Sequence, residues 1–181
     1  KGRASQGDGR LQQKVLDHLP YQPTGAQRRA VAEITDDMGS THRMNRLLQG
    51  DVGAGKTLVA FLALLHAVEA GGQGVLMAPT EILARQHLQG LQPLAEHAGV
   101  VLELLTGRDK GRERQDKLAA LAAGDIHILV GTHAVFQADV HFADLRLAVV
   151  DEAFDRLDAD SSGAVTLRDV RMHFDAKQHP D

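Results

Sequence analysis

The sequence contains no cysteine and no tryptophan, and it has one tyrosine and five phenylalanines among 181 residues. Without cysteine the chain has no disulfide framework and no zinc site built on thiolates, which is compatible with a reducing compartment. Its ten histidines include no H-x-x-x-H pair, so we expect no zinc. The scarcity of aromatic residues argues against base stacking as a main way of binding nucleic acid.

Long hydrophobic runs are also missing. The longest apolar stretch, residues 58–68, is interrupted by His66 and is too short to span a bilayer. No N-terminal segment has the layout of a signal peptide. We therefore expect no membrane partner and a cytoplasmic location. The chain opens on Lys1, which suggests a fragment or a processed form.

The net charge of -4 is unevenly distributed. Residues 151–181 carry eight acidic and four basic residues, out of 24 and 20 in the whole chain, so 16 acids and 16 bases precede them. The whole negative excess thus lies at the C-terminal end. This asymmetry predicts two different modules in one chain.

Apolar segments alternate with helix-forming segments over residues 19–152, while residues 1–18 are polar and are expected to be a linker or a frayed helix. Val/Ile/Leu-rich strands between helices predict an α/β fold, with a mostly parallel sheet covered by helices on both faces. Pro93 should kink or split its helix. The expected strands are 44–49, 74–78, 100–105, 126–130 and 147–150, and the expected helices are 58–70, 80–97 and 109–123. Ligands should bind at the carboxyl ends of the strands, where Gly50, Pro79, Gly131 and Asp151 fall.

Residues 50–57 match the pattern G-x-x-x-x-G-K-T, which follows a predicted strand and precedes a predicted helix. In such a loop the backbone N–H groups surround phosphates, the lysine reaches the β and γ oxygens, and the threonine hydroxyl binds Mg²⁺. A chance glycine-rich turn is the alternative. The predicted nucleotide-binding residues here are Gly50, Asp51, Val52, Gly53, Ala54, Gly55, Lys56 and Thr57.

Two further features favour a nucleotide site. A buried strand leads into Asp151 and Glu152, which would bind the metal and orient the attacking water. A solvated strand end is the alternative for this acidic pair. Gln27 can pair with adenine through its side-chain amide, although it can equally be a surface helix residue.

The motifs taken in order resemble those of superfamily 2 DNA helicases, and most closely the RecG family. The resemblance rests on Gln27, residues 50–57, Met77–Ala84, Leu105–Gly107, Gly131–Gln137 and Val150–Glu152. It implies a first RecA-like lobe over residues 19–152 that binds ATP and Mg²⁺ and acts on branched or forked DNA in recombination and repair. It also implies DNA-backbone contacts by Thr80, Gly107 and Thr132, for which ordinary helix caps and turns are the alternative.

The sequence departs from this family after Glu152. The family continues with Gln-His and an Arg-Phe-Gly segment, whereas residues 153–157 read Ala-Phe-Asp-Arg-Leu. The second helicase lobe and the N-terminal wedge domain are absent from the 181 residues. ATP hydrolysis needs charge neutralised from the other side of the nucleotide, so we expect the hydrolase activity of this chain alone to be very weak, with Glu152 and Lys56 as its catalytic residues.

The C-terminal segment has its own pattern. Residues 158–169 fit a twelve-residue EF-hand loop with glycine at the sharp turn, and residues 153–180 are similar to an EF-hand of the calcyphosine family. An acidic surface turn is the alternative. The expected Ca²⁺ ligands are Asp158, Asp160, Ser162, the Ala164 carbonyl, Thr166 and Asp169.

Two hypotheses therefore remain open from the sequence. The chain is either the ATP-binding lobe of a DNA helicase or a calcium-binding fragment. The two resemblances meet at a single peptide bond, which suggests a chimera.

Overall fold

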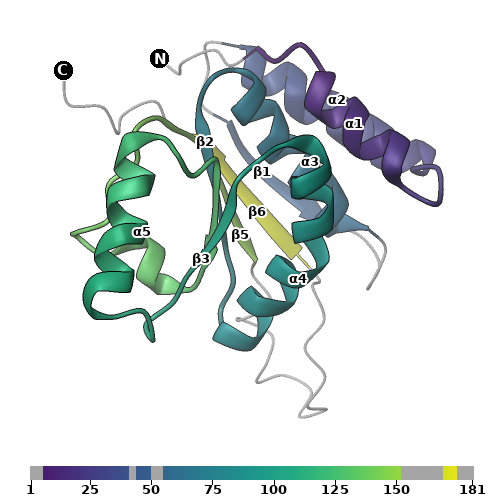
Figure 1. Cartoon of the computed structure of the whole chain (residues 1–181). Helices are drawn as coiled ribbons and strands as arrows, with labels where there is room; N and C mark the ends of the chain where they lie inside the picture. The colour runs from purple at the N-terminus through teal and green to yellow at the C-terminus, as the bar shows by residue number, and fades with distance from the viewer. Residues whose placement is uncertain (1–5, 41–43, 50–54, 152–168, 175–181) are drawn as a thin grey trace.

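A computed structural model of the chain describes residues 6–40, 44–49, 55–151 and 169–174. These residues form one sheet with helices against it (Figure 1). In chain order the elements are α1 (Arg10–His18), α2 (Gly25–Gly39), β1 (Met44–Gln49), α3 (Lys56–Glu69), β2 (Gln73–Met77), α4 (Glu81–Ala98), β3 (Leu102–Leu105), α5 (Gly111–Ala123), β4 (Ile128–Gly131), the 3-10 helix η1 (His133–Phe136), β5 (Leu145–Asp151) and β6 (Asp169–Phe174).

The sheet has the strand order β1-β6-β5-β2-β4-β3. Strands β5, β2, β4 and β3 run parallel to one another, as expected for an α/β sheet. Only β6 runs antiparallel, and it pairs with β1 on one side and with β5 on the other. The prediction of a mostly parallel α/β sheet is therefore confirmed.

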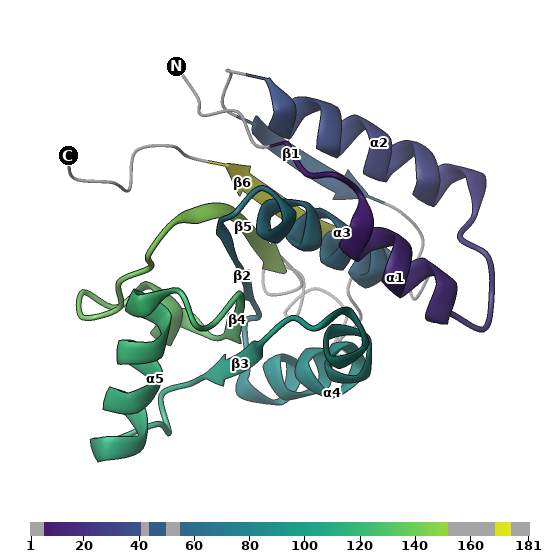
Figure 2. The ribbon, with the colours of Figure 1, turned by 45° about the horizontal axis from the view of Figure 1, so that its top comes forward.

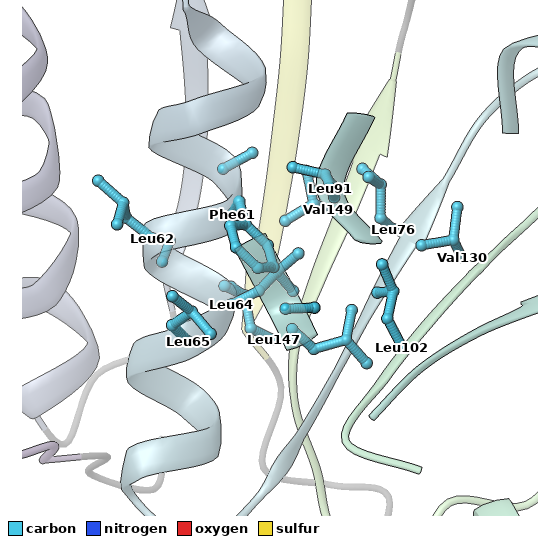
Figure 3. Packing of buried hydrophobic residues seen from close by; sticks show 14 of the residues in the cluster. Phe61, Leu62, Leu64, Leu65, Leu76, Leu91, Leu102, Val130, Leu147 and Val149 are labelled. Atoms are coloured by element: carbon cyan, nitrogen blue, oxygen red, sulfur yellow. The ribbon is translucent and has the colours of Figure 1, made fainter. Parts of the chain in front are cut away.

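The larger core lies on the face of the sheet covered by α1 to α4 (Figure 2). Helix α3 is apolar around most of its circumference, and such a helix is stable only when it is buried on all sides. Phe61 and Leu64 lie on its side toward the sheet, and Leu62 lies on the opposite side (Figure 3). Burying each of these side chains contributes about 1.5–3 kcal/mol relative to exposure.

A smaller core lies on the opposite face, beneath α5 and η1. Alternate residues of each strand serve the two faces. Leu76 and Val149 face α3 and α4, whereas Val75 and Leu129 pack with Leu121 of α5. Helices on both faces are therefore confirmed.

Local signals determine where several helices begin and end. The Thr80 side chain accepts a hydrogen bond from Leu83 N at 3.2 Å and caps α4, as expected. Helix α5 ends at Gly124, also as expected. Of the kink or split expected at Pro93, the split is wrong, because α4 continues through that residue. The apolar stripe that includes Leu91 and Ala95 packs into the core and offsets the lost backbone hydrogen bond.

A linker and a frayed helix were the alternatives expected for residues 1–18, and residues 10–18 are helical. They form α1, whose Val15 is fully buried. The Glu69 carboxylate accepts hydrogen bonds from Gly9 N and Gln12 N, each at 2.9 Å. A residue of α3 thus accepts two N–H groups at the start of α1, while Asp8, just before the helix, accepts a third from Arg10 N at 3.0 Å.

The C-terminal segment also differs from expectation. Its described part, Asp169–Phe174, is the strand β6, whereas an EF-hand would place its second helix there. Pairing with both β1 and β5 satisfies the backbone of β6 on both sides, which favours the strand. The expected helix-loop-helix over residues 153–181 is therefore wrong for residues 169–174, which belong to the same sheet as the rest of the fold.

Within the described residues, no helix combines the length and the apolar character that crossing a membrane requires.

Candidate functional site

The carboxyl ends of four parallel strands lie level with one another along one edge of the sheet. Leu105 of β3 pairs with Gly131 of β4, Gly131 pairs with Met77 of β2, and Met77 pairs with Val150 of β5. The segments that follow these residues must therefore leave the sheet at the same edge. We call it the carboxyl edge, defined by Leu105, Gly131, Met77 and Val150.

The three residues expected to contact a nucleic-acid backbone all follow the carboxyl edge. Thr80 caps α4 after β2, Gly107 lies in the turn after β3, and Thr132 precedes η1 after β4. The structure brings them to one side of the sheet. Their contacts with DNA stay a prediction.

Gly131 allows the close approach of β4 to β3. A Cβ at this position would overlap the backbone oxygen of Leu105, which cannot move without breaking the pairing of the strands. The sequence marked Gly131 as the end of a strand and the start of a motif. The structure shows that the lack of a side chain at Gly131 lets the ends of β3 and β4 lie this close.

The turn after β3 is fixed by a polar cluster. Asp109 Oδ2 accepts a hydrogen bond from Thr106 N at 2.8 Å, and Asp109 Oδ1 accepts one from Lys117 Nζ at 2.8 Å. Lys117 also donates to the Leu104 carbonyl oxygen at 2.9 Å. Burial alone would raise the pKa of Asp109, but the hydrogen bonds from Lys117 and Thr106, with the positive charge of Lys117, bring it below its ordinary value.

A second charged group links the turns after β2 and β3. Glu81, in the first turn of α4, forms ion pairs with Arg85 at 2.9 Å and with Arg108 at 3.1 Å. The two arginine side chains are 51% and 82% exposed. Two cations and one anion leave a net positive charge beside Thr80 and Gly107.

The start of α3 carries the described part of the phosphate-loop motif. Gly55 has the left-handed φ of 75°, which turns the chain into the helix. Lys56 is buried although it is charged, and Thr57 is partly exposed beside it. The dipole of α3 and its first N–H groups favour an anion at this end.

Gln27 lies against this turn. Its Oε1 accepts a hydrogen bond from Thr24 N at 2.8 Å, within the capping box that begins α2. A Cβ on Gly55 would collide with Gln27 Nε2. The structure thus brings Gln27 to the phosphate-loop motif, from which it is separated by more than twenty residues in the sequence.

Asp151 ends β5 at the carboxyl edge, and its side chain is inaccessible to solvent. His87 of α4 lies next to it, with Nε2 at 3.2 Å from Asp151 Oδ2. No local sequence pattern marks His87 as a site residue, because the contact joins residues 64 positions apart. One signal was present: His87 falls on the buried stripe of α4 that contains Ala84 and Leu91.

Some of the predicted site residues lie outside the described residues. These are Gly50 to Ala54, Glu152, Asp158, Asp160, Ser162, Ala164 and Thr166. Of the expected Ca²⁺ ligands only Asp169 is described, and it is the first residue of β6, level with Gln49 of β1.

Among the described residues at this end of the sheet, Asp151 is the carboxylate that could hold a resident metal. Among the described residues, no group of three or more His, Asp or Glu side chains could hold a metal ion. Mg²⁺ with a nucleotide is bound through one or two protein ligands, with the phosphates supplying further oxygens. Asp151 and Thr57 fit that requirement.

Comparison with known proteins supports one family. The family model described as DEAD/DEAH box helicase matches residues 24–178. The chain is 53% identical over 139 residues to the ATP-dependent DNA helicase RecG of Bacillus subtilis (strain 168), covering 77% of this chain and 20% of that protein. It is 49% identical over 142 residues to RecG of Escherichia coli (strain K12), covering 78% and 20%. The chain therefore spans about a fifth of the length of these relatives.

Solved structures agree with this assignment. The structure described as RecG bound to a three-way DNA junction superposes with a TM-score of 0.73 at 43% identity, covering 81% of this chain and 20% of that one. Dbp5 of S. cerevisiae, bound to RNA and ADP BeF3, has a TM-score of 0.62 at 22% identity over 85% of this chain and 38% of its own, which shows the shared fold alone. The EF-hand interpretation has no support among these matches, and the family model extends across most of the segment that suggested it. The chain belongs to the DEAD/DEAH box helicase family.

Proposed function

We propose that this chain is the ATP-binding lobe of a RecG-like DNA helicase and that it binds Mg-ATP between the start of α3 and Asp151. The observation that carries the proposal is the burial of two opposite charges at the same end of the sheet: Lys56 is 6% exposed and Asp151 is 2% exposed. Burying a charge is costly, so such residues are retained where a ligand or partner uses them.

Each residue has a distinct task in this proposal. Lys56 binds the β and γ phosphates, Thr57 and Asp151 hold the Mg²⁺, and Glu152 orients the attacking water. The Mg²⁺ ion, when bound, neutralises phosphate charge and orients the phosphates for in-line attack. These roles rest on the match to the phosphate-loop motif and on the placement of Lys56, Thr57 and Asp151.

Adenine selection is assigned to Gln27. Its position against Gly55 supports this role. If the phosphates bind at the start of α3, the base lies to one side of the turn at Gly55, and Gln27 lies next to that turn. An amide side chain can donate and accept at once and can thereby distinguish adenine from other bases.

The nucleotide is proposed to bind at the end of β5 and the start of α3, which we call the nucleotide half of the carboxyl edge. DNA is the proposed partner at the ends of β2, β3 and β4, which we call the DNA half. Thr80, Gly107 and Thr132 would hold the phosphate backbone through hydroxyl and N–H groups, which grip DNA without reading its sequence. One of the RecG structures similar to this chain is bound to a three-way junction, so branched or forked DNA is the substrate class we propose. The cytoplasmic location expected from the sequence stays a prediction.

The hydrolytic activity of these 181 residues alone should be very low. Phosphoryl transfer requires charge on the γ phosphate to be neutralised from more than one side, and the residues assigned here cover only one. We expect ATP binding without DNA unwinding. A DNA-stimulated hydrolysis rate typical of an intact helicase would contradict this part of the proposal.

The direct test is ATP affinity, measured by calorimetry on the wild type and on Lys56→Ala in the presence of Mg²⁺. Removing the phosphate-binding charge should weaken binding at least about tenfold, equivalent to 1.4 kcal/mol. Lys14→Ala, an exposed residue of α1, is the matched control and should bind like the wild type. Unchanged affinity in Lys56→Ala would refute the proposed site.

A further inference from the structure

We infer that His87 is a positioning residue for the metal site: its Nε2–H holds the Asp151 carboxylate in the orientation that Mg²⁺ requires. The inference rests on the proposed function, because it assigns a residue to the site at which Mg-ATP is proposed to bind. It adds a residue of α4, an element to which the proposed function gives only a DNA contact.

The contact between the two side chains is buried and direct. The Nε2–Oδ2 distance is 3.2 Å, the His87 side chain is 10% exposed and the Asp151 side chain is 0% exposed. A carboxylate that holds a metal ion only accepts hydrogen bonds, so the inferred role requires the form of the His87 ring that carries a proton on Nε2. This hydrogen bond restricts rotation of the Asp151 side chain and so keeps the carboxylate directed toward the proposed metal position.

The place of His87 in α4 favours this role over a packing role. The helix buries Ala84, Leu91, Ala95 and Ala98 on one face, all of them apolar, and His87 occupies the same stripe at the spacing of the next turn. A leucine there would add apolar burial without a polar cost. The histidine instead meets the one carboxylate that ends β5.

Removal of the His87 imidazole should weaken the binding of Mg²⁺ at Asp151. An Asp151 carboxylate without its donor would be buried with one interaction fewer and free to adopt other rotamers. Residues that hydrogen-bond metal ligands typically change metal affinity 10–100-fold when they are removed. The effect of His87 should therefore be confined to metal-dependent binding.

Helix α4 also joins the two halves of the carboxyl edge. Thr80 caps its N-terminus and His87 lies seven residues later, about 10 Å along the axis of a helix. The element that is proposed to grip DNA at one end therefore touches the proposed metal ligand two turns further on. A shift of α4 would move both contacts together.

The experiment measures ATP affinity of the wild type, His87→Leu and His87→Gln, once with Mg²⁺ and once with EDTA. In His87→Leu the dissociation constant with Mg²⁺ should rise about tenfold, while the value in EDTA stays unchanged. His87→Gln keeps an N–H donor of similar reach and should restore most of the loss. His141→Leu, at an exposed position, is the control and should match the wild type.

A second readout requires no substitution. The ¹⁵N chemical shifts of the His87 ring in metal-free wild type should show a protonated Nε2. Added Mn²⁺ with ATP should broaden the His87 signals, because the ion would be bound to Asp151, which contacts His87. A ring protonated only on Nδ1 would overturn the inference, even if His87→Leu failed to fold.

The outcomes separate the inference from the proposed function. If the wild type binds ATP and Lys56→Ala does not, but His87→Leu keeps the full Mg²⁺ dependence, only the role of His87 is refuted. The same holds if His87→Leu weakens binding equally with Mg²⁺ and with EDTA. If the wild type itself shows no Mg²⁺-dependent ATP binding, the proposed function fails.

Discussion

The two halves of the carboxyl edge differ in the burial of their charged side chains. At the proposed nucleotide half, Lys56 and Asp151 are almost completely buried, and His87 is packed against Asp151. At the proposed DNA half, Arg85 and Arg108 extend into solvent and share the carboxylate of Glu81. The same edge of the sheet therefore carries one group of charges that is shielded from solvent and one that is exposed to it.

The difference agrees with what each half is proposed to bind. A buried charge is costly in the empty protein, but it interacts strongly with a ligand in a region of low dielectric constant. An exposed charge costs little and is weakened by salt, which suits attraction to an extended phosphate backbone. Substitutions in the buried half should consequently have large, specific effects, and those in the exposed half small, salt-dependent ones.

The largest effect is expected for Asp151→Ala. It removes the proposed carboxylate ligand of Mg²⁺ and leaves His87 without its acceptor, so ATP affinity in Mg²⁺ should fall about 100-fold, or 2.8 kcal/mol. Calorimetric titration with Mg²⁺ and with EDTA checks the result. Asp125→Ala, at an exposed position before β4, serves as the control. An equal loss with and without Mg²⁺ would show that Asp151 supports the fold rather than the metal.

A smaller effect is expected for Asp109→Asn, which lies between the two extremes with a side chain that is 12% exposed. Losing the ion pair with Lys117 while keeping the volume should reduce the free energy of unfolding by about 1–2 kcal/mol at pH 7. Urea unfolding followed by circular dichroism measures it. Asp116→Asn, on the exposed side of α5, is the matched control.

The pH dependence of this difference has a defined sign. The folded-state pKa of Asp109 lies below its ordinary value of 3.8, so the ionised form is the one that stabilises the fold. The contribution should be fully present above the ordinary value and should disappear as the pH falls through the lowered pKa. A difference between wild type and Asp109→Asn that persists below that window would contradict the ion pair as its origin.

The smallest effect is expected for Arg108→Ala. With a side chain that is 82% exposed, it should weaken binding to a three-way DNA junction only about threefold at low salt, and it should reduce the dependence of log affinity on log salt by about one. Fluorescence anisotropy across a salt series measures both quantities. Arg112→Ala, exposed at the start of α5, is the control. A large loss of DNA affinity that does not depend on salt would indicate that Arg108 makes a buried contact with DNA. It would contradict the proposed difference between the two halves.

Local sequence signals predicted the strands and helices between residues 44 and 151 well. The strand over residues 44–49 and the start of α4 at Thr80 were placed correctly, because apolar runs, caps and terminal glycines act within a few residues. Pro93 is an instructive exception. It lies in a helix whose buried face is strong enough to outweigh a local penalty.

Contacts between distant residues were not predictable in the same way. Helix α1 is held by Glu69, about sixty residues away, so its polar sequence could not decide between a linker and a frayed helix. Strand β6 was assigned to an EF-hand because residues 158–169 match that spacing, but its pairing with β1 and β5 has no counterpart in the local pattern. His87 was missed for the same reason.

The sequence alone determined most of the strands and helices between residues 44 and 151 and the phosphate-loop motif that ends at Lys56 and Thr57, since both depend on neighbouring residues. Only the tertiary structure decided that Gln27 lies against Gly55, that His87 meets Asp151, and that β6 lies between β1 and β5. Those placements depend on how helices and strands pack, and packing is a property of surfaces assembled from the whole chain.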